Sequence, residues 1–157
     1  MKAASLYETD FYAWTRDQAA RLRQSRPNSV DWELLAEEVE DLGRSQFNAV
    51  LSHLRNLLAH LLMAAHSTDD GLIRHWRSEM VGFHSDAIDA FTNAMRQRLE
   101  PELPKVWDRA RRQAAGHLAE PVPEFPAQCP FSLEELLDEG FDMERAAERI
   151  RSGGGNA

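Results

Sequence analysis

The fold of this chain is decided by the stretch DWELLAEEVEDLGRSQFNAVLSHLRNLLAHLLMAAH, which spans residues 31–66. It contains no proline and a single glycine, Gly43. Its apolar residues recur mostly at steps of three and four, which is the spacing of one face of an α-helix. This apolar seam consists of Leu35, Val39, Leu42, Phe47, Leu51, Leu54, Leu58, Leu61 and Ala65. The stretch therefore predicts one long helix.

Two further features of the seam predict how the long helix is used. The step from Leu42 to Phe47 is longer than the others, so the stripe shifts at Gly43 and predicts a kink or a short break there. A second stripe widens the apolar face and consists of Val50, Leu57 and Ala64. A face of this width contacts more than one neighbour, which predicts a central position for the helix.

Three further helices are expected: one that begins near Thr9 or a little earlier and runs to about residue 26, and two over about residues 73–94 and 101–118. Proline is tolerated only in the first turn of a helix, so Pro27 ends the first of these helices and Pro101 or Pro104 begins the last. The apolar stripe of the first consists of Tyr7, Phe11, Trp14, Gln18 and Leu22.

Beyond the last of these helices the chain changes character. Residues 121–126 include three prolines, which predicts an extended strap across the bundle. A capping box of Ser132 and Glu135 then begins a short helix. We therefore predict an all-α fold: an antiparallel four-helix bundle with a C-terminal extended strap and short helix. Residues 1–140 are expected to form one domain and residues 141–157 a weakly helical to disordered tail.

The composition indicates a soluble protein. The chain has 18 basic and 26 acidic residues and a formal net charge of −8. This charge disfavours nucleic acid, because such binding depends on neutralising phosphates with Lys and Arg. The N-terminus has no apolar signal core, and the mostly apolar run 57–65 is about half as long as a membrane span requires. We expect a cytoplasmic protein that binds neither nucleic acid nor membrane.

Four motifs are similar, in order and spacing, to those of a bacterial family. They are LYETDFYAW (6–14), LAEEVEDLGRS (35–45), LRNLLAHLL (54–62) and CPFSLEELLD (129–138). On these motifs the chain resembles the family called "domain of unknown function 29", over roughly residues 6–140. The resemblance implies an all-helical domain with no established activity. The polar residues at family-type positions are Asp10, Glu37, Glu38, Glu40, Arg44 and His60.

The sequence contains no catalytic motif. It lacks the phosphate-binding loop, the dinucleotide fingerprint, the nucleophile elbow and the zinc-protease pattern. The dimetal site of ferritin-like bundles needs Glu-x-x-His on two helices, and here no glutamate lies three residues before a histidine. The single cysteine, Cys129, precludes an intramolecular disulfide and is expected to be a small buried thiol.

Three histidines on consecutive helices are candidates for a metal site: His53, His84 and His117. If the chain reverses near residues 68–69 and again near residues 100–101, all three lie in one layer. Three imidazoles with a water are a common ligand set for zinc and related divalent transition metals. The alternative is three separate histidines at the edges of the seams, each hydrogen bonded to water or to a neighbour.

A second group of candidates for a polar site consists of His60, Glu79, Glu37 and Glu40. The same reversal places His60 level with about residue 77, so a hydrogen-bonded His60–Glu79 pair is expected at the edge of the core. A role in ligand binding is the alternative for His60. A straight helix separates Glu38 from His60 by about 33 Å, so the glutamates near Glu38 do not share a site with His60.

Three hypotheses about function follow. The first is a non-enzymatic interaction or regulatory module that contacts a protein partner, or a second copy of itself in a homodimer, through a helix face and without a cofactor. It rests on the missing catalytic motifs, the acidic charge and the wide apolar faces. The second is a metal-binding helical protein, a hydrolase or transferase, that uses the three-histidine layer. The third is a pocket for an apolar ligand within the bundle.

Overall fold

The computed structural model describes residues 3–24, 31–119, 121 and 124–153. Within these ranges all regular structure is helical, so the predicted all-α class is confirmed. The α-helices are α1 (Ala3–Thr9), α2 (Phe11–Gln24), α3 (Trp32–His66), α4 (Asp70–Ala90), α5 (Arg96–Leu99), α6 (Leu103–Leu118), α7 (Leu133–Leu136) and α8 (Met143–Arg151). Two 3-10 turns, η1 (Asn93–Met95) and η2 (Glu100–Glu102), flank α5. None of these helices is long and apolar enough to cross a membrane.

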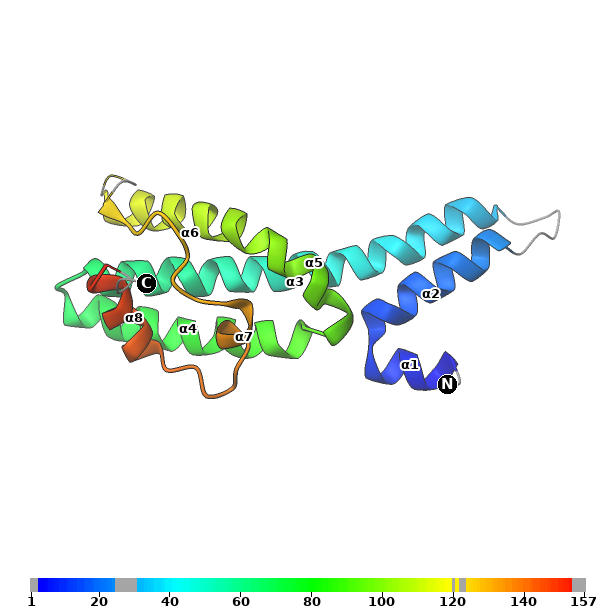
Figure 1. Cartoon of the computed structure of the whole chain (residues 1–157), viewed down its shortest axis with the longest axis horizontal. Helices are drawn as coiled ribbons and strands as arrows, with labels where there is room; N and C mark the ends of the chain where they lie inside the picture. Colours follow the sequence, from blue (N-terminus) through cyan, green and yellow to red (C-terminus); the bar gives the residue numbers. More distant parts are fainter. Residues whose placement is uncertain (1–2, 25–30, 120, 122–123, 154–157) are drawn as a thin grey trace.

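Helix α3 is the central element, as its wide apolar face predicts (Figure 1). The Asp31 side chain caps it by accepting a hydrogen bond from the Leu34 amide. Helix α2 packs along the N-terminal half of α3, whereas α4 and α6 pack along the C-terminal half. We call α2 with residues 32–48 of α3 the arm, and the rest of α3 with α4 to α8 the body.

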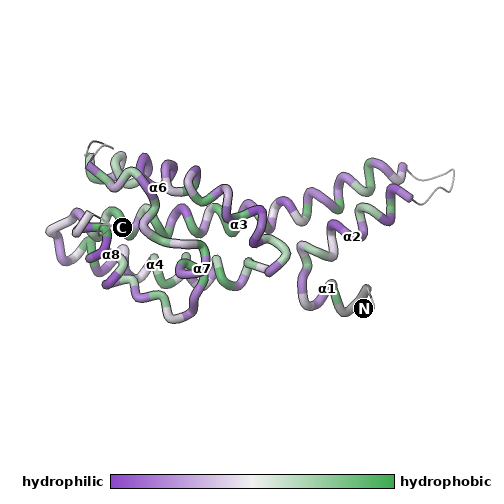
Figure 2. Tube along the Cα trace, in the orientation of Figure 1, coloured by the Kyte–Doolittle hydropathy of each residue, from purple (hydrophilic) through white to green (hydrophobic). Residues whose placement is uncertain are grey.

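The body contains most of the core. Every residue from Leu57 to Ala65 is buried, because α4, α6 and α8 all pack against this half of α3. These three neighbours contribute Trp76, Met80, Ala87, Val106, Trp107, Ala110, Ala114, Ala146, Ala147 and Ile150. Figure 2 shows the hydrophobic colouring concentrated along this part of the molecule. In the body, α4, α6 and α8 each pack against α3, whereas α2 packs against α3 only in the arm.

The arm is a two-helix hairpin that projects from the body (Figure 1). The residues buried between its helices are Tyr12, Thr15, Ala19, Ala36 and Gly43. Near its tip, Arg23 donates to Glu33 Oε1 at 3.0 Å and to the two carboxylate oxygens of Glu40 at 2.6 and 3.0 Å. The predicted helix end at Pro27 lies outside the described residues.

Gly43 marks a close approach of the two arm helices. Of the predicted kink or short break, the break is absent. Helix α3 is continuous from Trp32 to His66. A Cβ atom at Gly43 would overlap the hydroxyl of Thr15, which is held by its hydrogen bond to the Tyr12 carbonyl at 2.8 Å. The apolar stripe shifts here because α3 changes neighbours, from α2 in the arm to α4 and α6 in the body.

Short turns after α4 join the arm to the body. The predicted third helix extended to Ala94, but α4 ends at Ala90 and η1, α5 and η2 follow. Asp10 divides the predicted first helix into α1 and α2, and its carboxylate accepts from the amides of Ala13 at 2.8 Å and of Ala94 at 3.4 Å. Gln46 donates to the Ala90 carbonyl at 3.1 Å. These bonds fix both arm helices to the turn that follows α4.

The described part of the C-terminal segment forms a strap and the predicted short helix, while residues 122–123 of the predicted strap lie outside the described residues. Trp107 donates to the Pro126 carbonyl at 3.0 Å, and the Ser132–Glu135 capping box begins α7. The boundary expected at residue 140 does not divide the core, because α8 packs on α3 and Ile150 is 2% exposed. The end of the expected tail, residues 154–157, lies outside the described residues.

Candidate functional site

The junction of arm and body encloses a hollow of about 280 Å³. Its lining consists of Tyr12 and Arg16 from α2, Glu40, Arg44, Phe47 and Asn48 from α3, and Arg98 from α5. Three arginine side chains and a single glutamate therefore line one space. This local excess of positive charge contrasts with the net charge of −8 for the whole chain. We call this space the junction hollow.

Neighbouring groups hold the lining of the junction hollow in place. Arg98 donates to the hydroxyl oxygen of the buried Tyr12 at 2.5 Å and lies 5.9 Å from the centre of the Phe47 ring. Among the described residues the Tyr12 hydroxyl accepts from Arg98 and donates to no acceptor, so an anion in the hollow can accept its hydrogen bond. Arg16 makes no hydrogen bond or ion pair with the described part of the chain.

The single carboxylate of the hollow is already engaged. Hydrogen bonds from Arg23 hold the pKa of Glu40 below its ordinary value, and the charges of Arg16 and Arg44 add to this effect. Glu40 is therefore ionised and neutralised by Arg23 from the tip side of the hairpin. Arg44 forms an ion pair with Asp41 at the surface.

A second hollow of about 280 Å³ adjoins the first, and Asn48 lines both. Its other lining residues are Leu51, Ser52, Arg55, Val106 and Arg109. Arg55 donates to the Ser52 hydroxyl at 3.3 Å, while its buried Nε has no partner among the described residues. Together the two hollows are lined by five arginines and one glutamate. We call them the basic groove.

The arm also exposes apolar side chains that the sequence places in the seam. Leu35 is 42% exposed and Leu42 is 53% exposed, and Val39 lies between them at helical spacing. The predicted seam is therefore wrong in this half of α3, where Ala36 and Gly43 face α2 instead. Because Ala36 and Gly43 are small, they permit the close approach of α2. Helix α3 therefore contacts α2 through these residues, which directly follow Leu35 and Leu42.

Helix α2 continues this apolar surface. In α2, each residue of the stripe Phe11, Trp14 and Gln18 comes directly before a buried residue, namely Tyr12, Thr15 and Ala19. In α3, Leu35 and Leu42 likewise come directly before the buried Ala36 and Gly43. Two antiparallel helices are related by an approximate two-fold axis normal to the plane that contains them. Residues that precede the buried residues by one position on either helix therefore lie on the same side of the hairpin. We call this side the arm face; it consists of Phe11, Trp14, Leu22, Leu35, Val39 and Leu42.

Aromatic packing orders one end of the arm face. The rings of Phe11 and Trp14 stack at a centroid distance of 5.7 Å, and Tyr7 of α1 contacts Trp14 edge-on at 4.9 Å. Tyr7 remains 53% exposed. The basic groove lies on the other side of the hairpin, because Arg16 and Arg44 follow the buried Thr15 and Gly43 by one residue.

The structure does not bring together the three histidines predicted as a metal layer. His53 faces Asp86 at 3.9 Å, His84 packs on the Phe141 ring, and His117 is bonded to the carbonyl one turn before it. Within the described residues, no group of three or more His, Cys, Asp or Glu side chains is placed to hold a metal ion.

The metal layer fails because the register of α6 differs from the predicted one. Gln113 donates to Asn56 at 3.2 Å, which sets α6 alongside α3. The two helices run parallel, so His117 is level with about residue 60 and lies roughly 10 Å beyond His53 along the axis. The cause is the segment 91–102, which forms several short turns instead of the single tight reversal that was predicted.

The predicted His60–Glu79 pair is confirmed. His60 Nε2 lies 2.8 Å from Glu79 Oε2, and its Nδ1 lies 2.8 Å from the Asn56 carbonyl. His75 lies 3.6 Å from the same Glu79 oxygen. This cluster contains no nucleophile and cross-links α3 to α4.

The two glutamates grouped with His60 belong to the arm. Glu40 lines the junction hollow and binds Arg23, whereas Glu37 is exposed on the surface of α3. The four residues of the predicted polar site are therefore two separate groups, as the distance along α3 requires.

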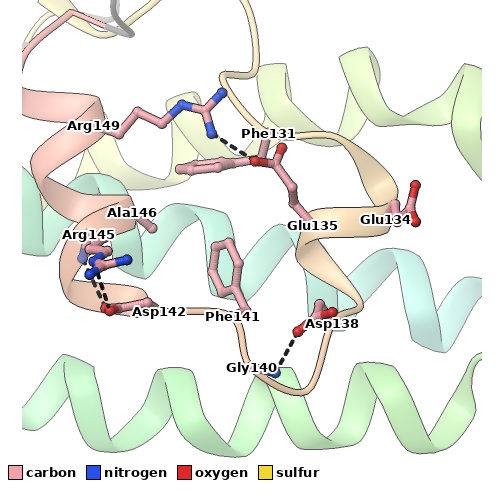
Figure 3. Close-up of a pocket in the computed structure, with 10 residues that line it drawn as sticks. All are labelled: Phe131, Glu134, Glu135, Asp138, Gly140, Phe141, Asp142, Arg145, Ala146 and Arg149. Carbon is pink, nitrogen blue, oxygen red and sulfur yellow. Dashed lines mark hydrogen bonds and ion pairs between the residues drawn. The ribbon is translucent and has the colours of Figure 1, made fainter.

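A third hollow, of about 450 Å³, lies between α7 and α8 (Figure 3). Arg149 crosses it to donate to Glu135 at 2.9 Å and lies 5.3 Å from the centre of the Phe131 ring. Asp138 accepts from the Gly140 amide at 2.7 Å. In Figure 3, dashed lines join Arg149 to Glu135 and Arg145 to Asp142, so these charges are already paired. The contacts around this hollow therefore chiefly connect the strap to α8.

Cys129 is an unreactive thiol at neutral pH. Burial raises the pKa of its thiol to about 11, and the Glu135 charge acts in the same direction. The thiol is therefore protonated at neutral pH, which does not favour a nucleophile, and Cys129 is half-buried rather than fully buried as predicted.

Comparison with known proteins decides the family. The model of the family "Domain of unknown function DUF29" matches residues 6–142. The chain belongs to this family. A crystal structure of an alpha-helical protein of unknown function from Rhodospirillum rubrum is similar, with 32% identity and a TM-score of 0.83, covering 92% of this chain and 96% of that one. No curated protein matches the chain. Neither the family name nor that of the structural neighbour specifies an activity.

Sequence reasoning missed the basic groove. Its arginines come from α2, α3, α5 and α6, and each one alone has the pattern of a solvated helix face. The available signals were weak: Tyr12, Glu40 and Arg44 lie inside the motifs that carry the family resemblance. Their convergence with Arg98 depends on the turns between α4 and α6, which no local pattern specifies.

Proposed function

We propose that this DUF29 protein is a non-enzymatic self-association module in which two copies join through their arm faces. The exposure of Leu35 and Leu42 is the observation that carries the proposal. These leucines lie on an ordered helix, beside the aromatic side chains of α2, on a part of the molecule that projects from the body. Contiguous exposed apolar surface of this kind is typical of interaction sites.

A second copy of the chain is the partner that best fits the arm face. A two-helix hairpin with one apolar side is half of a four-helix bundle, and a second hairpin related by a two-fold axis completes it. The charges are complementary as well. At the border of the arm face, Arg21 makes α2 basic and Glu38 makes the arm part of α3 acidic. Stacking α2 of one copy on α3 of the other pairs opposite charges.

The test is the molar mass in solution, measured by sedimentation equilibrium over a range of concentrations. We expect the wild-type chain to dimerise and the double variant Leu35→Glu/Leu42→Glu to be monomeric. The matched control is Leu72→Glu/Val81→Glu, which places the same charges at exposed apolar positions of α4, outside the arm. This control should dimerise like the wild type. A monomeric wild type, or equal dissociation of both variants, would overturn the proposal.

A charge exchange tests the predicted pairing of α2 with α3. Glu38 lies between Leu35 and Leu42 on the helix surface, so Glu38→Arg places a positive charge opposite the basic α2 of the second copy. This variant should dimerise more weakly, and adding Arg21→Glu should restore part of the affinity. No rescue, with circular dichroism showing intact helices, would refute this orientation of the two copies.

A further inference from the structure

We propose that the basic groove binds the oligophosphate group of a small molecule. One phosphoryl group would lie in the junction hollow among Arg16, Arg44 and Arg98, and the chain of phosphates would extend past Asn48 to Arg55 and Arg109. The site is separate from the arm face, because it lies on the opposite side of the hairpin. Self-association and ligand binding can therefore be tested independently.

The donor set of the junction hollow suits a phosphoryl group. Guanidinium groups bind phosphate oxygens in a bidentate manner, and here they approach from α2, α3 and α5. The Tyr12 hydroxyl adds a donor, because its oxygen already accepts from Arg98. A terminal phosphate carries about −1.5 to −2 charges at neutral pH. The hollow opposes this charge with Arg16 and Arg98, while Arg44 also pairs with Asp41 and Arg23 neutralises Glu40.

The adjoining hollow indicates more than one phosphate. Asn48 lines both spaces, so they form one continuous groove along α3. Arg44 and Arg55 are separated by about 16 Å along the helix axis, and their long side chains can reach toward Asn48 between them. The buried Nε of Arg55 lacks a partner in the described structure. A triphosphate presents acceptors along such a groove, whereas a single phosphate fills one end.

The groove favours a small ligand over a nucleic acid. The two hollows measure about 280 Å³ each, and the flanking arm surface of α3 carries Glu37, Glu38 and Asp41. A long polyanion that continued beyond the groove would meet these carboxylates. A short oligophosphate meets only the arginines.

The test is isothermal titration calorimetry of the full chain with inorganic phosphate, inorganic tripolyphosphate and metal-free ATP. We expect tripolyphosphate to bind at least about tenfold more tightly than phosphate, because the longer chain contacts both hollows. ATP that binds more tightly than tripolyphosphate would identify a nucleotide source, and equal affinity would identify the phosphate chain alone as the recognised group.

Arginine variants locate the site. Arg44→Gln should weaken phosphate and tripolyphosphate alike, by about tenfold or more, because it acts in the junction hollow. Arg109→Gln should weaken tripolyphosphate while leaving phosphate within about twofold. The control Arg74→Gln removes the same charge from an exposed position on α4.

Three results would overturn the proposal. They are the absence of measurable tripolyphosphate binding, binding that Arg44→Gln does not weaken, and equal weakening by Arg74→Gln. Thermal unfolding of each variant establishes that it is folded, and Arg44→Lys gives a second reading of the same position. Lysine keeps the charge but loses the bidentate geometry, so an affinity between those of wild type and Arg44→Gln is expected.

Discussion

Both halves of α3 carry leucines at helical spacing, three in the arm and six in the body, but the surroundings of these leucines differ greatly. In the body, Leu57, Leu58, Leu61 and Leu62 are each fully buried, whereas in the arm Leu34, Leu35 and Leu42 are between 42% and 54% exposed. One continuous helix therefore passes from a completed bundle into an incomplete one. The comparison shows that an apolar stripe is buried only where other elements pack against it. The chain itself supplies such elements for the body half of α3, but not for the arm half.

Leucine-to-alanine substitutions should give the largest difference between the two halves of α3 in the free energy of unfolding. Leu61→Ala leaves a cavity in the body and should lower the free energy of unfolding by about 2–5 kcal/mol. Leu42→Ala removes an exposed side chain and should change it by less than about 0.5 kcal/mol. Urea denaturation at low protein concentration, where the arm faces are separate, measures both. Equal losses would show that the arm face is covered within a single chain.

Glycine substitutions should separate the halves next. Gly43→Ala forces a Cβ atom against Thr15 and should destabilise the fold by about 1–3 kcal/mol. Gly116→Ala in α6 meets no atom within 4 Å and should stabilise it by up to about 1 kcal/mol. Thermal unfolding compares the two. The double variant Thr15→Ala/Gly43→Ala should recover most of the loss, and failure to do so would contradict the close approach at Gly43.

The capping box of α7 should give a smaller, pH-dependent effect in the body. Ser132→Ala should cost about 1 kcal/mol, because the hydroxyl caps the Glu135 amide.

The Ser132 amide and Arg149 hold the pKa of Glu135 below its ordinary value of 4.5. A lowered pKa in the folded state means that the ionised group stabilises the fold above about pH 5, and that this contribution disappears as the pH falls through the folded pKa. Denaturation of Glu135→Gln and wild type should therefore differ at pH 7 and converge near pH 3.

The smallest effect is expected from Glu40→Gln in the arm. The Arg23–Glu40 pair is exposed to solvent, so its loss should matter less for global stability than Ser132→Ala. Its effect should be local, because it joins the two helices of the projecting hairpin. Hydrogen exchange should become faster for amides 34–46 and stay unchanged for amides 54–65. Faster exchange in both ranges would show that arm and body unfold as one unit.

Much of the body could be predicted from the sequence. Helical periodicity located α3, and the Ser132–Glu135 capping box located α7. The His60–Glu79 pair followed from the reversal after α3, because a tight turn between two long helices fixes their register to within a turn. These features depend on residues near each other in sequence or linked by one short turn.

The candidate sites depended on tertiary structure. The histidine layer failed since the segment 91–102 spreads over several short turns and shifts α6. The same segment delivers Arg98 to Tyr12 and thereby builds the junction hollow. The sequence by itself determined that the chain is helical and where its long apolar stripes lie, because these are local properties of side-chain spacing. Only the tertiary structure decided which stripe stays uncovered and which arginines converge, because both depend on the packing of helices distant in sequence.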